Sequence, residues 1–372
     1  MLGDMKIPIL LLAAALSMGR LNAAEPTVAA TNLVPATAPE VLVEGRCVKT
    51  PAGAVRLGFP GITFHLLHHG GSLAMRVNAT SDQVYFDVRA DGGEPVRLRC
   101  HAGDGDYALL DHAAAGDHEL EITRRTESWE GTCDVLGFLP GSGERLLPPA
   151  ALPERKLMFI GDSITCGAAT DIRPDDPLKG ANAHDEQTSN AGFSFGKILA
   201  RRLNAQCHLV SYGGRGVIRD WQGIMTLNNA PIFYERALPD DPSSLWNPAD
   251  YVPDAIVICL GTNDFSPGVP DENEFVNAYV EFVRKIRRDA PHAKIFLADS
   301  PMLWDAPGKA PKHTVLHAYL LETLEKINDP GVRMAPVKHY EGVPNNGHPT
   351  HANHEAIADE IEPLLRQALG WN

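Results

Sequence analysis

The second half of the chain alternates short apolar runs with longer amphipathic segments, and this alternation restricts the fold more than any other feature. Each run is brief and is followed by turn residues, which predicts a β-strand. The segments between the runs carry apolar residues at helical spacing. Strands that alternate with helices form a parallel sheet with helices on both faces. We expect strands at residues 156–160, 207–212, 254–260, 294–299 and 332–337, and helices at residues 191–203, 272–289, 313–327 and 352–369.

The preceding residues have a different pattern. Residues 41–148 contain short segments of alternating polarity, such as GITFHLLHH, SLAMRVNAT and VYFDVRA, separated by glycine, aspartate and asparagine. This pattern predicts an all-β sandwich. Residues 141–154 are rich in glycine and proline and predict a linker. The 372 residues suffice for two domains, each with its own core, which we place at residues 41–150 and 151–372.

The N-terminus has the pattern of a secretory signal peptide. Lys6 precedes the apolar run IPILLLAAALSM, and small residues around Ala23 supply a cleavage site. The run is too short to span a membrane. We expect residues 1–24 to be removed, residues 25–40 to form a disordered leader, and the mature protein to be periplasmic or secreted, without membrane association.

Charge and cysteine content narrow the classes of ligand. The formal net charge is −14, from 33 basic and 47 acidic residues, which disfavours nucleic acid and fits an uncharged ligand such as a sugar. Six cysteines permit up to three disulfides, and their spacing does not match a zinc site. Cys259 lies in the apolar run AIVICL, which predicts that its thiol is buried. Pairing of Cys47 with Cys100 or with Cys133 stays open.

The first predicted strand of the parallel sheet ends in Gly161-Asp162-Ser163, which places a hydroxyl where the next helix begins. Unpaired backbone N–H groups there favour negative charge. Ligands bind such sheets outside the carboxyl ends of the strands. Ser163 is therefore a candidate nucleophile, although Asp-Ser at this place is also ordinary helix-capping chemistry. We expect Asp162 to support the serine turn.

A serine nucleophile needs a base and donors for the charged oxygen of a tetrahedral intermediate. His348, in a loop before the last predicted helix, is the candidate base. The candidate donors are the Ser163 N–H, a backbone N–H in residues 211–217 and the Asn263 amide, and we choose Gly214 within that range. The competing interpretations are a helix entry for His348, a tight turn for the glycines and an Asx-turn for Asn263.

These residues and their order resemble the SGNH (GDSL) hydrolase superfamily. GDSIT carries Ser163, SYGGRG carries Gly214, GTND carries Asn263 and HPTHANHEAIA carries His348. The resemblance covers residues 156–372. It implies a flavodoxin-like α/β domain with a five-stranded parallel sheet. It also implies a serine esterase with Ser163 and His348 as catalytic residues, and an oxyanion hole made by Ser163, Gly214 and Asn263.

A narrower resemblance covers nearly the whole mature chain. A β-sandwich with the segment FPGI at residues 59–62 precedes GDSITCG and the GRGV of the second block. This arrangement resembles carbohydrate esterase family 2, whose members join a jelly-roll domain to an SGNH domain. The resemblance implies removal of acetyl groups from plant polysaccharides such as xylan and glucomannan, without a cofactor. A lipase or thioesterase and a carbohydrate-binding protein remain as alternatives.

One position departs from the superfamily pattern. Most SGNH hydrolases carry an aspartate three residues before the histidine, and Asn345 stands there, followed by Asn346. Neither side chain supplies the negative charge that stabilises an imidazolium. We therefore expect a Ser-His dyad in which Asn345, Asn346 or a main-chain carbonyl accepts a hydrogen bond from His348.

Three further interpretations concern ligands and assembly. Trp304 follows a predicted strand end and could stack on a sugar or be buried against a helix, and Trp221 and Trp246 are further candidates. His351 and His354 follow His348 at steps of three, which on a helix points the outer side chains apart. We expect no metal, a monomer, and an acetylated polysaccharide or oligosaccharide as substrate.

Overall fold

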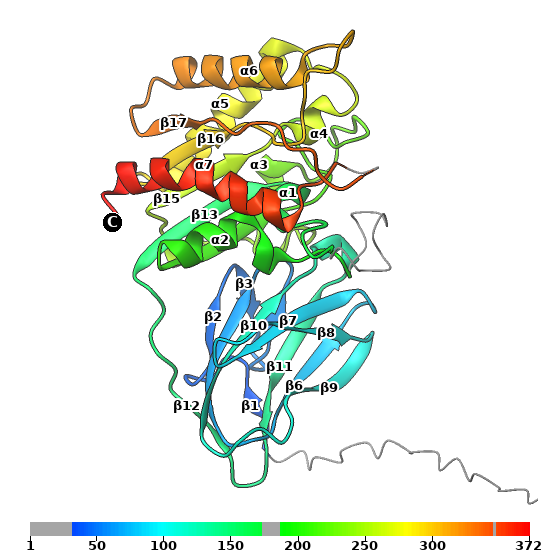
Figure 1. Ribbon diagram of the computed structural model, residues 1–372, viewed down its shortest axis with the longest axis vertical. Coiled ribbons are helices and arrows are strands. Elements are labelled where there is room, and N and C mark those ends of the chain that lie inside the picture. The colour runs from blue at the N-terminus through cyan, green and yellow to red at the C-terminus, as the bar shows by residue number, and fades with distance from the viewer. Residues whose placement is uncertain (1–31, 173–186, 345–346) are drawn as a thin grey trace, which may run out of the picture. The chain divides into compact units, whose positions relative to one another are not determined.

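Residues 32–172, 187–344 and 347–372 are described by the computed structural model (Figure 1). The predicted signal peptide and residues 25–31 of the predicted leader lie outside these ranges. Across the ranges that are described, no helix combines the length and apolar character needed to cross a membrane.

Two antiparallel sheets form the predicted sandwich. One has the strand order β3-β4-β11-β6-β9 with β1 beside β11, and the other has β12-β5-β10-β7-β8 with β2 beside β5. Rings from the two sheets meet in the interior, where Phe64 and Phe138 pack edge to face at 5.7 Å. The strands are β1 (Val34–Pro35), β2 (Leu42–Glu44), β3 (Cys47–Lys49), β4 (Val55–Leu57), β5 (Thr63–His69), β6 (Leu73–Ala79), β7 (Val84–Ala90), β8 (Val96–Cys100), β9 (Gly103–Leu110), β10 (Asp117–Arg124), β11 (Cys133–Pro140) and β12 (Arg145–Leu147).

Strand pairing begins earlier in the chain than the sequence predicts. Val34 and Pro35 pair with Phe138 and Gly137 of β11, and Ala36 is fully buried. Residues 33–40 therefore belong to the sandwich and not to a disordered leader, because their backbone groups and apolar side chains find partners on β11. Similarly, β12 lies inside the predicted linker of residues 141–154 and pairs with β5.

Five parallel strands form the second sheet, in the order β14-β13-β15-β16-β17. All five residues of β15 are buried, as expected for a strand covered on both faces. This order is the flavodoxin-like arrangement, in which the chain reverses direction across the sheet between β13 and β15. The strands are β13 (Arg155–Gly161), β14 (Ala205–Ser211), β15 (Ala255–Cys259), β16 (Lys294–Ala298) and β17 (Val332–Ala335). The predicted fold class is confirmed.

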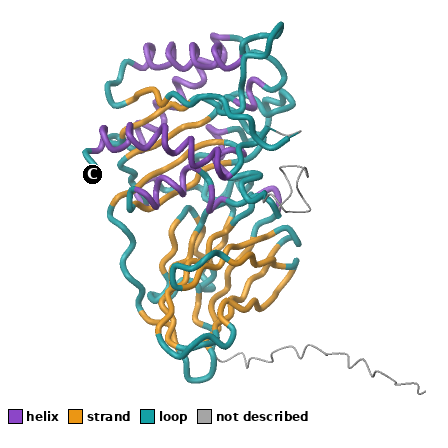
Figure 2. Tube along the Cα trace, in the orientation of Figure 1, coloured by secondary structure: helices purple, strands orange, loops and turns teal. Residues whose placement is uncertain are grey.

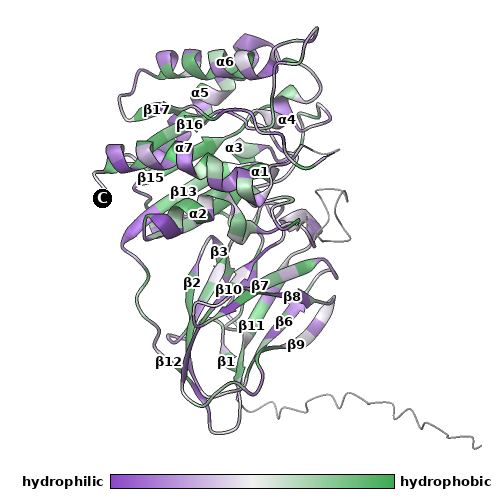
Figure 3. Ribbon diagram, in the orientation of Figure 1, coloured by the Kyte–Doolittle hydropathy of each residue, from purple (hydrophilic) through white to green (hydrophobic). Residues whose placement is uncertain are grey.

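Helices cover both faces of the parallel sheet (Figure 2). The pair α2 and α7 shares one apolar core with the sheet, and α5 and α6 lie in the other. Figure 3 shows the hydrophobic strands between helices that carry polar outer faces. The helices are α1 (Ser163–Cys166), α2 (Phe195–Arg202), α3 (Ala230–Phe233), α4 (Thr262–Phe265), α5 (Glu272–Asp289), α6 (Lys312–Ile327) and α7 (His351–Leu369), with short 3₁₀ turns η1 (Ser128–Glu130), η2 (Ala191–Phe193) and η3 (Pro248–Asp250).

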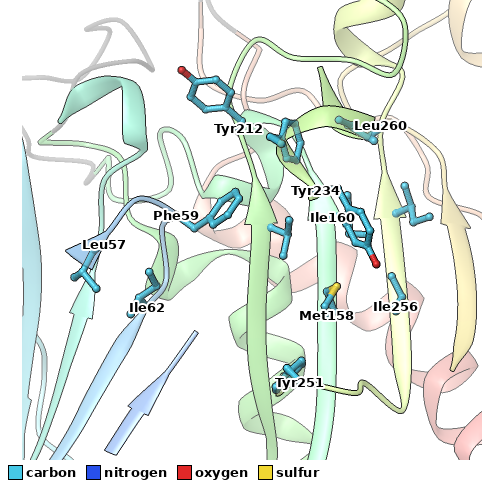
Figure 4. Packing of buried hydrophobic residues seen from close by; sticks show 14 of the residues in the cluster. Leu57, Phe59, Ile62, Met158, Ile160, Tyr212, Tyr234, Tyr251, Ile256 and Leu260 are labelled. Atoms are coloured by element: carbon cyan, nitrogen blue, oxygen red, sulfur yellow. The ribbon is translucent and has the colours of Figure 1, made fainter. Parts of the chain in front are cut away.

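The core of the sandwich continues into the parallel-sheet region. Leu57, Phe59 and Ile62 belong to the same buried cluster as Met158 and Ile160 of β13 (Figure 4). The expected separate cores are thus joined, because the end of the sandwich covers apolar surface beside the parallel sheet.

All six cysteines are free thiols in the described structure. Cys259 is buried in β15, as its apolar surroundings predict.

Candidate active site

A cavity of about 610 Å³ opens at the carboxyl ends of β13, β14 and β15. Its walls come from the segments that follow these three strands and β16, from the loop before α7 and from η1 of the sandwich. The four residues predicted from the sequence motifs all line it, together with two tryptophans. These lining residues are Ser163, Gly214, Asn263, His348, Trp129 and Trp221.

The predicted nucleophile and base form a hydrogen bond. Nε2 of His348 lies 2.7 Å from Oγ of Ser163, and both residues are buried. Ser163 is the first residue of α1, because β13 ends at Gly161 and Asp162 caps the helix by accepting from the Ile164 N–H at 3.0 Å. The geometry allows His348 to take the serine proton as a general base.

The loop before α7 holds the histidine by main-chain bonds. The Val343 N–H donates to the His348 carbonyl at 2.8 Å, and the Gly347 N–H donates to the Val343 carbonyl at the same distance. Asn345 and Asn346, the predicted side-chain partners of the ring, lie outside the described residues.

Two backbone N–H groups at the cavity are available to a ligand. Among the described residues, neither the Ser163 N–H nor the Gly214 N–H has a hydrogen-bond acceptor. Gly214 has a φ of +75°, a backbone conformation that residues other than glycine rarely adopt. Its carbonyl accepts a hydrogen bond from the Trp221 N–H at 3.0 Å. These donors could stabilise an oxyanion on a substrate attacked by Ser163.

A buried carboxylate holds the far end of the loop that carries Gly214. Asp264 accepts from the backbone N–H groups of Val217 and Ile218, at 3.0 and 2.8 Å. A side chain at position 216 would meet this carboxylate, because a Cβ added to Gly216 would lie 2.2 Å from Oδ2. Burial raises the pKa of Asp264 to about 6, against the hydrogen bonds that favour its charged form.

The Asn263 amide links two parts of the site. Its Nδ2 donates to the Arg215 carbonyl at 2.9 Å and lies 3.2 Å from Oδ2 of Asp162. The side chain therefore lines the cavity while it ties the glycine loop to the serine turn. To donate to an oxyanion, one of these N–H groups must turn toward the cavity when substrate is bound.

The buried Asp162 carboxyl group accepts hydrogen bonds from the Ile164 N–H and from the Asn263 amide. Burial raises the pKa of its carboxyl to about 7, and the nearby Glu127 and Asp264 carboxylates act in the same direction. Hydrogen bonds from the Ile164 N–H and the Thr262 hydroxyl oppose the increase. Its contacts are with the serine turn and with Asn263.

Of the three tryptophans considered from the sequence, Trp221 alone lines the cavity. Trp304 does not line the cavity; it is 53% exposed and its ring stacks near His339 at 6.2 Å. Trp246 is partly buried and packs beneath the Arg46 guanidinium at 4.8 Å. Trp221 does line the cavity, and Trp129 of η1 faces it from the sandwich. Sequence analysis missed Trp129, since nothing in its local pattern distinguishes it from an ordinary turn residue.

The histidines after His348 have structural contacts. His351 stacks on Phe193 at 4.4 Å, and Nδ1 of His354 accepts from the Phe195 N–H at 3.1 Å. The described part of the chain contains no group of three or more histidine, cysteine or carboxylate side chains suited to holding a metal.

Each half of the chain matches a known protein family. Residues 43–149 match the carbohydrate esterase 2 N-terminal family, and residues 159–357 match the GDSL-like lipase/acylhydrolase family. An acetylxylan esterase / glucomannan deacetylase from Cellvibrio japonicus is 33% identical over 98% of this chain and 99% of its own length. The chain belongs to carbohydrate esterase family 2.

Solved structures of this family have the same architecture. A family two carbohydrate esterase from Cellvibrio japonicus superposes with a TM-score of 0.84 at 32% identity, covering 91% of this chain and 98% of that one. The family two enzyme from Clostridium thermocellum, in complex with cellohexaose, gives 0.82 at 28% identity, covering 89% and 100%. This family 2 esterase is therefore a serine carboxylic ester hydrolase with a sandwich followed by a GDSL-type domain.

Proposed function

We propose that this esterase removes acetyl groups from acetylated polysaccharides such as xylan and glucomannan. The hydrogen bond between Ser163 and His348 carries this proposal, together with the Ser163 and Gly214 N–H groups at the same cavity, which have no acceptor among the described residues. The name of the Cellvibrio japonicus relative supports the choice of substrate. The formal charge of −14 is compatible with an uncharged polymer.

The proposed reaction proceeds through an acetyl-enzyme. Oγ of Ser163 attacks the acetyl carbonyl carbon while Nε2 of His348 takes the hydroxyl proton. The N–H groups of Ser163 and Gly214, joined by the Asn263 amide, stabilise the negative oxygen of the tetrahedral intermediate.

Release of the sugar and of acetate uses the same histidine. His348 gives its proton to the sugar oxygen as the ester C–O bond breaks, which leaves the acetyl group on Ser163. His348 then takes a proton from a water molecule that attacks this acetyl group, and acetate leaves as Ser163 recovers its proton.

The walls of the cavity favour a sugar ring beside the ester. Trp129, from the sandwich, is 44% exposed, and Trp221, from the segment after β14, is 55% exposed. Exposed indole faces stack on the apolar faces of sugars, and their N–H groups can bond hydroxyls. We infer that these two side chains contact the carbohydrate part of the substrate.

Release of acetate, followed by NMR, tests the proposal. Acetylated xylan, acetylated glucomannan and acetyl-glucose are compared side by side, with the S163A protein as control. We expect acetate from the polysaccharides with the wild-type protein alone. Activity that rises steeply from acetyl to long acyl esters would instead indicate a lipase-type enzyme and overturn the proposal.

We also propose that the protein is exported and acts as a monomer in the periplasm or outside the cell. The basic residue, apolar run and small residues of segment 1–24 support export. Mass spectrometry of the protein recovered from cell fractions tests it, with a mature start at Ala24 or Glu25 as the expected result. Light scattering of the purified protein tests the monomer.

A further inference from the structure

A glutamate of the sandwich reaches the loop that carries Gly214. The Gly213 N–H donates to Oε2 of Glu127 at 2.5 Å, across 86 positions in the sequence. Glu127 lies between β10 and η1 and is 1% exposed. The contact therefore joins the sandwich directly to the peptide unit that precedes the predicted oxyanion donor.

The surroundings of Glu127 hold its carboxylate in place. Oε2 of Glu130 accepts from the Glu127 N–H at 2.6 Å, and the Glu127 side chain accepts in turn from the Glu130 backbone. The buried Arg124 guanidinium donates to the carbonyls of Thr126 and Glu127, both at 3.0 Å. Such a network presents the acceptor with little freedom to move.

This contact occupies the first of the two adjacent glycine amides in the loop. Because the Gly213 N–H is committed to Glu127, the next N–H, that of Gly214, is left for a ligand. A Cβ added at position 213 would lie 2.4 Å from Oε2, so the position accepts only glycine while the carboxylate is there. With Asp264 bonded to Val217 and Ile218, the loop is held at both ends by buried carboxylates.

Other bonds join the sandwich to the parallel-sheet region without touching this loop. Arg125 pairs with Asp171 at 2.7 Å, and Arg97 pairs with the same aspartate at 3.0 Å. The interface therefore has charged contacts of its own apart from Glu127. This separation makes it possible to distinguish a loop-positioning role for Glu127 from simple attachment of the two regions.

We propose that Glu127 is a positioning residue for the reaction: it orients the Gly213–Gly214 peptide so that the Gly214 N–H points at the developing oxyanion. The inference rests on the proposed function, in which this N–H stabilises the transition state. Displacement of such a donor lowers the rate of the chemical step and leaves ground-state binding nearly unchanged.

Steady-state kinetics of the full-length protein with 4-nitrophenyl acetate test the role. For E127A we expect kcat to fall about 10- to 100-fold while KM changes by less than about threefold. In E127Q the amide oxygen can still accept from the Gly213 N–H, so kcat should stay within about fivefold of wild type. The control R97Q removes an ion pair between the same two regions and should leave kcat within about twofold.

Thermal unfolding of each variant shows which proteins are folded at the assay temperature. If E127A is not folded, the test uses E127D, which keeps the charge and shortens the side chain by one methylene group. We expect its kcat to fall by a similar factor to that expected for E127A. A folded E127A or E127D with wild-type kcat overturns the inference. The inference is also overturned if E127A changes only KM. It is overturned as well if E127Q or R97Q lowers kcat as much as E127A does. Absence of hydrolysis by the wild-type protein instead overturns the proposed function, and the inference with it.

Discussion

Ser163 and His348 meet at 2.7 Å although they stand 185 positions apart in the chain. Ser163 follows the first strand of the parallel sheet and His348 precedes the last helix, so the other four strands of the sheet lie between them in the sequence. Folding brings a weak nucleophile and its base together only once this sheet is complete. Esterase activity therefore reports on the integrity of the entire region.

Replacement of either member of this pair should remove activity. We expect S163A and H348A each to lower kcat for 4-nitrophenyl acetate by about 10⁴-fold or more, because each removes a group that acts in both half-reactions. The double variant should be little worse than either single one, since the two groups act as a unit. Turnover by S163A close to wild type would show that another residue is the nucleophile.

Asn263 should affect the rate of the chemical step more than substrate binding. We expect N263A to lower kcat by about 100-fold and to leave KM within about threefold, as for loss of an oxyanion donor. Thermal unfolding gives the accompanying loss of stability from the broken bonds to Arg215 and Asp162. A large loss of stability with unchanged kcat would assign Asn263 to loop support alone.

The two cavity tryptophans should distinguish polymeric from small substrates. We expect W129A and W221A to raise KM about 10-fold for acetylated xylo-oligosaccharides, with little effect on 4-nitrophenyl acetate. Trp304 provides the matched control, because it is exposed but is not one of the residues that line the cavity. W304A should resemble wild type with both substrates. Equal effects of the three substitutions would argue against a carbohydrate contact at Trp129 and Trp221.

Buried His354 should make the protein less stable in mild acid. Burial lowers its pKa from 6.5 to about 3, and Nδ1 accepts from the Phe195 N–H. Below pH 6.5 the unfolded chain binds a proton that the folded chain excludes, so stability falls as pH falls. This group alone should cost about 2 kcal/mol between pH 7 and pH 5.

The variant H354Q isolates this contribution. Glutamine keeps an acceptor for the Phe195 N–H but does not titrate, so denaturant unfolding should lose about 2 kcal/mol less than wild type between pH 7 and pH 5. Asp162 and Asp264 have raised pKa values and act in the opposite sense over this range, but they are common to both proteins. Parallel stability curves for the two proteins would contradict the assignment.

Residues with strong local signals could be placed from the sequence alone. Ser163 and Asn263 each follow an apolar strand, and His348 precedes an amphipathic helix, so their common sheet edge follows from the alternation of strands and helices. The strand β11 was harder to predict. Its register shifts between Val135 and Gly137, and such a bulge breaks the period-two alternation that marks a strand.

Contacts from the sandwich to the site could not be predicted. Glu127 and Trp129 lie in a short turn with no periodicity, and the Gly213 N–H from which Glu127 accepts is 86 positions away in the sequence. A pairing of this kind depends on how the two regions meet, which local propensity does not encode. Trp304 shows the converse: its position after a strand resembles that of a cavity residue, yet its ring lies beside His339.

The glutamate that the sandwich extends to Gly213 has a consequence for protein engineering. A chimaera that exchanged the first half of this enzyme for that of a distant relative would replace the anchor of a catalytic loop as well as a neighbouring module. Recombination near residue 150 should therefore yield fully active hybrids only when the donor brings a hydrogen-bond acceptor to the Gly213 N–H at the same place.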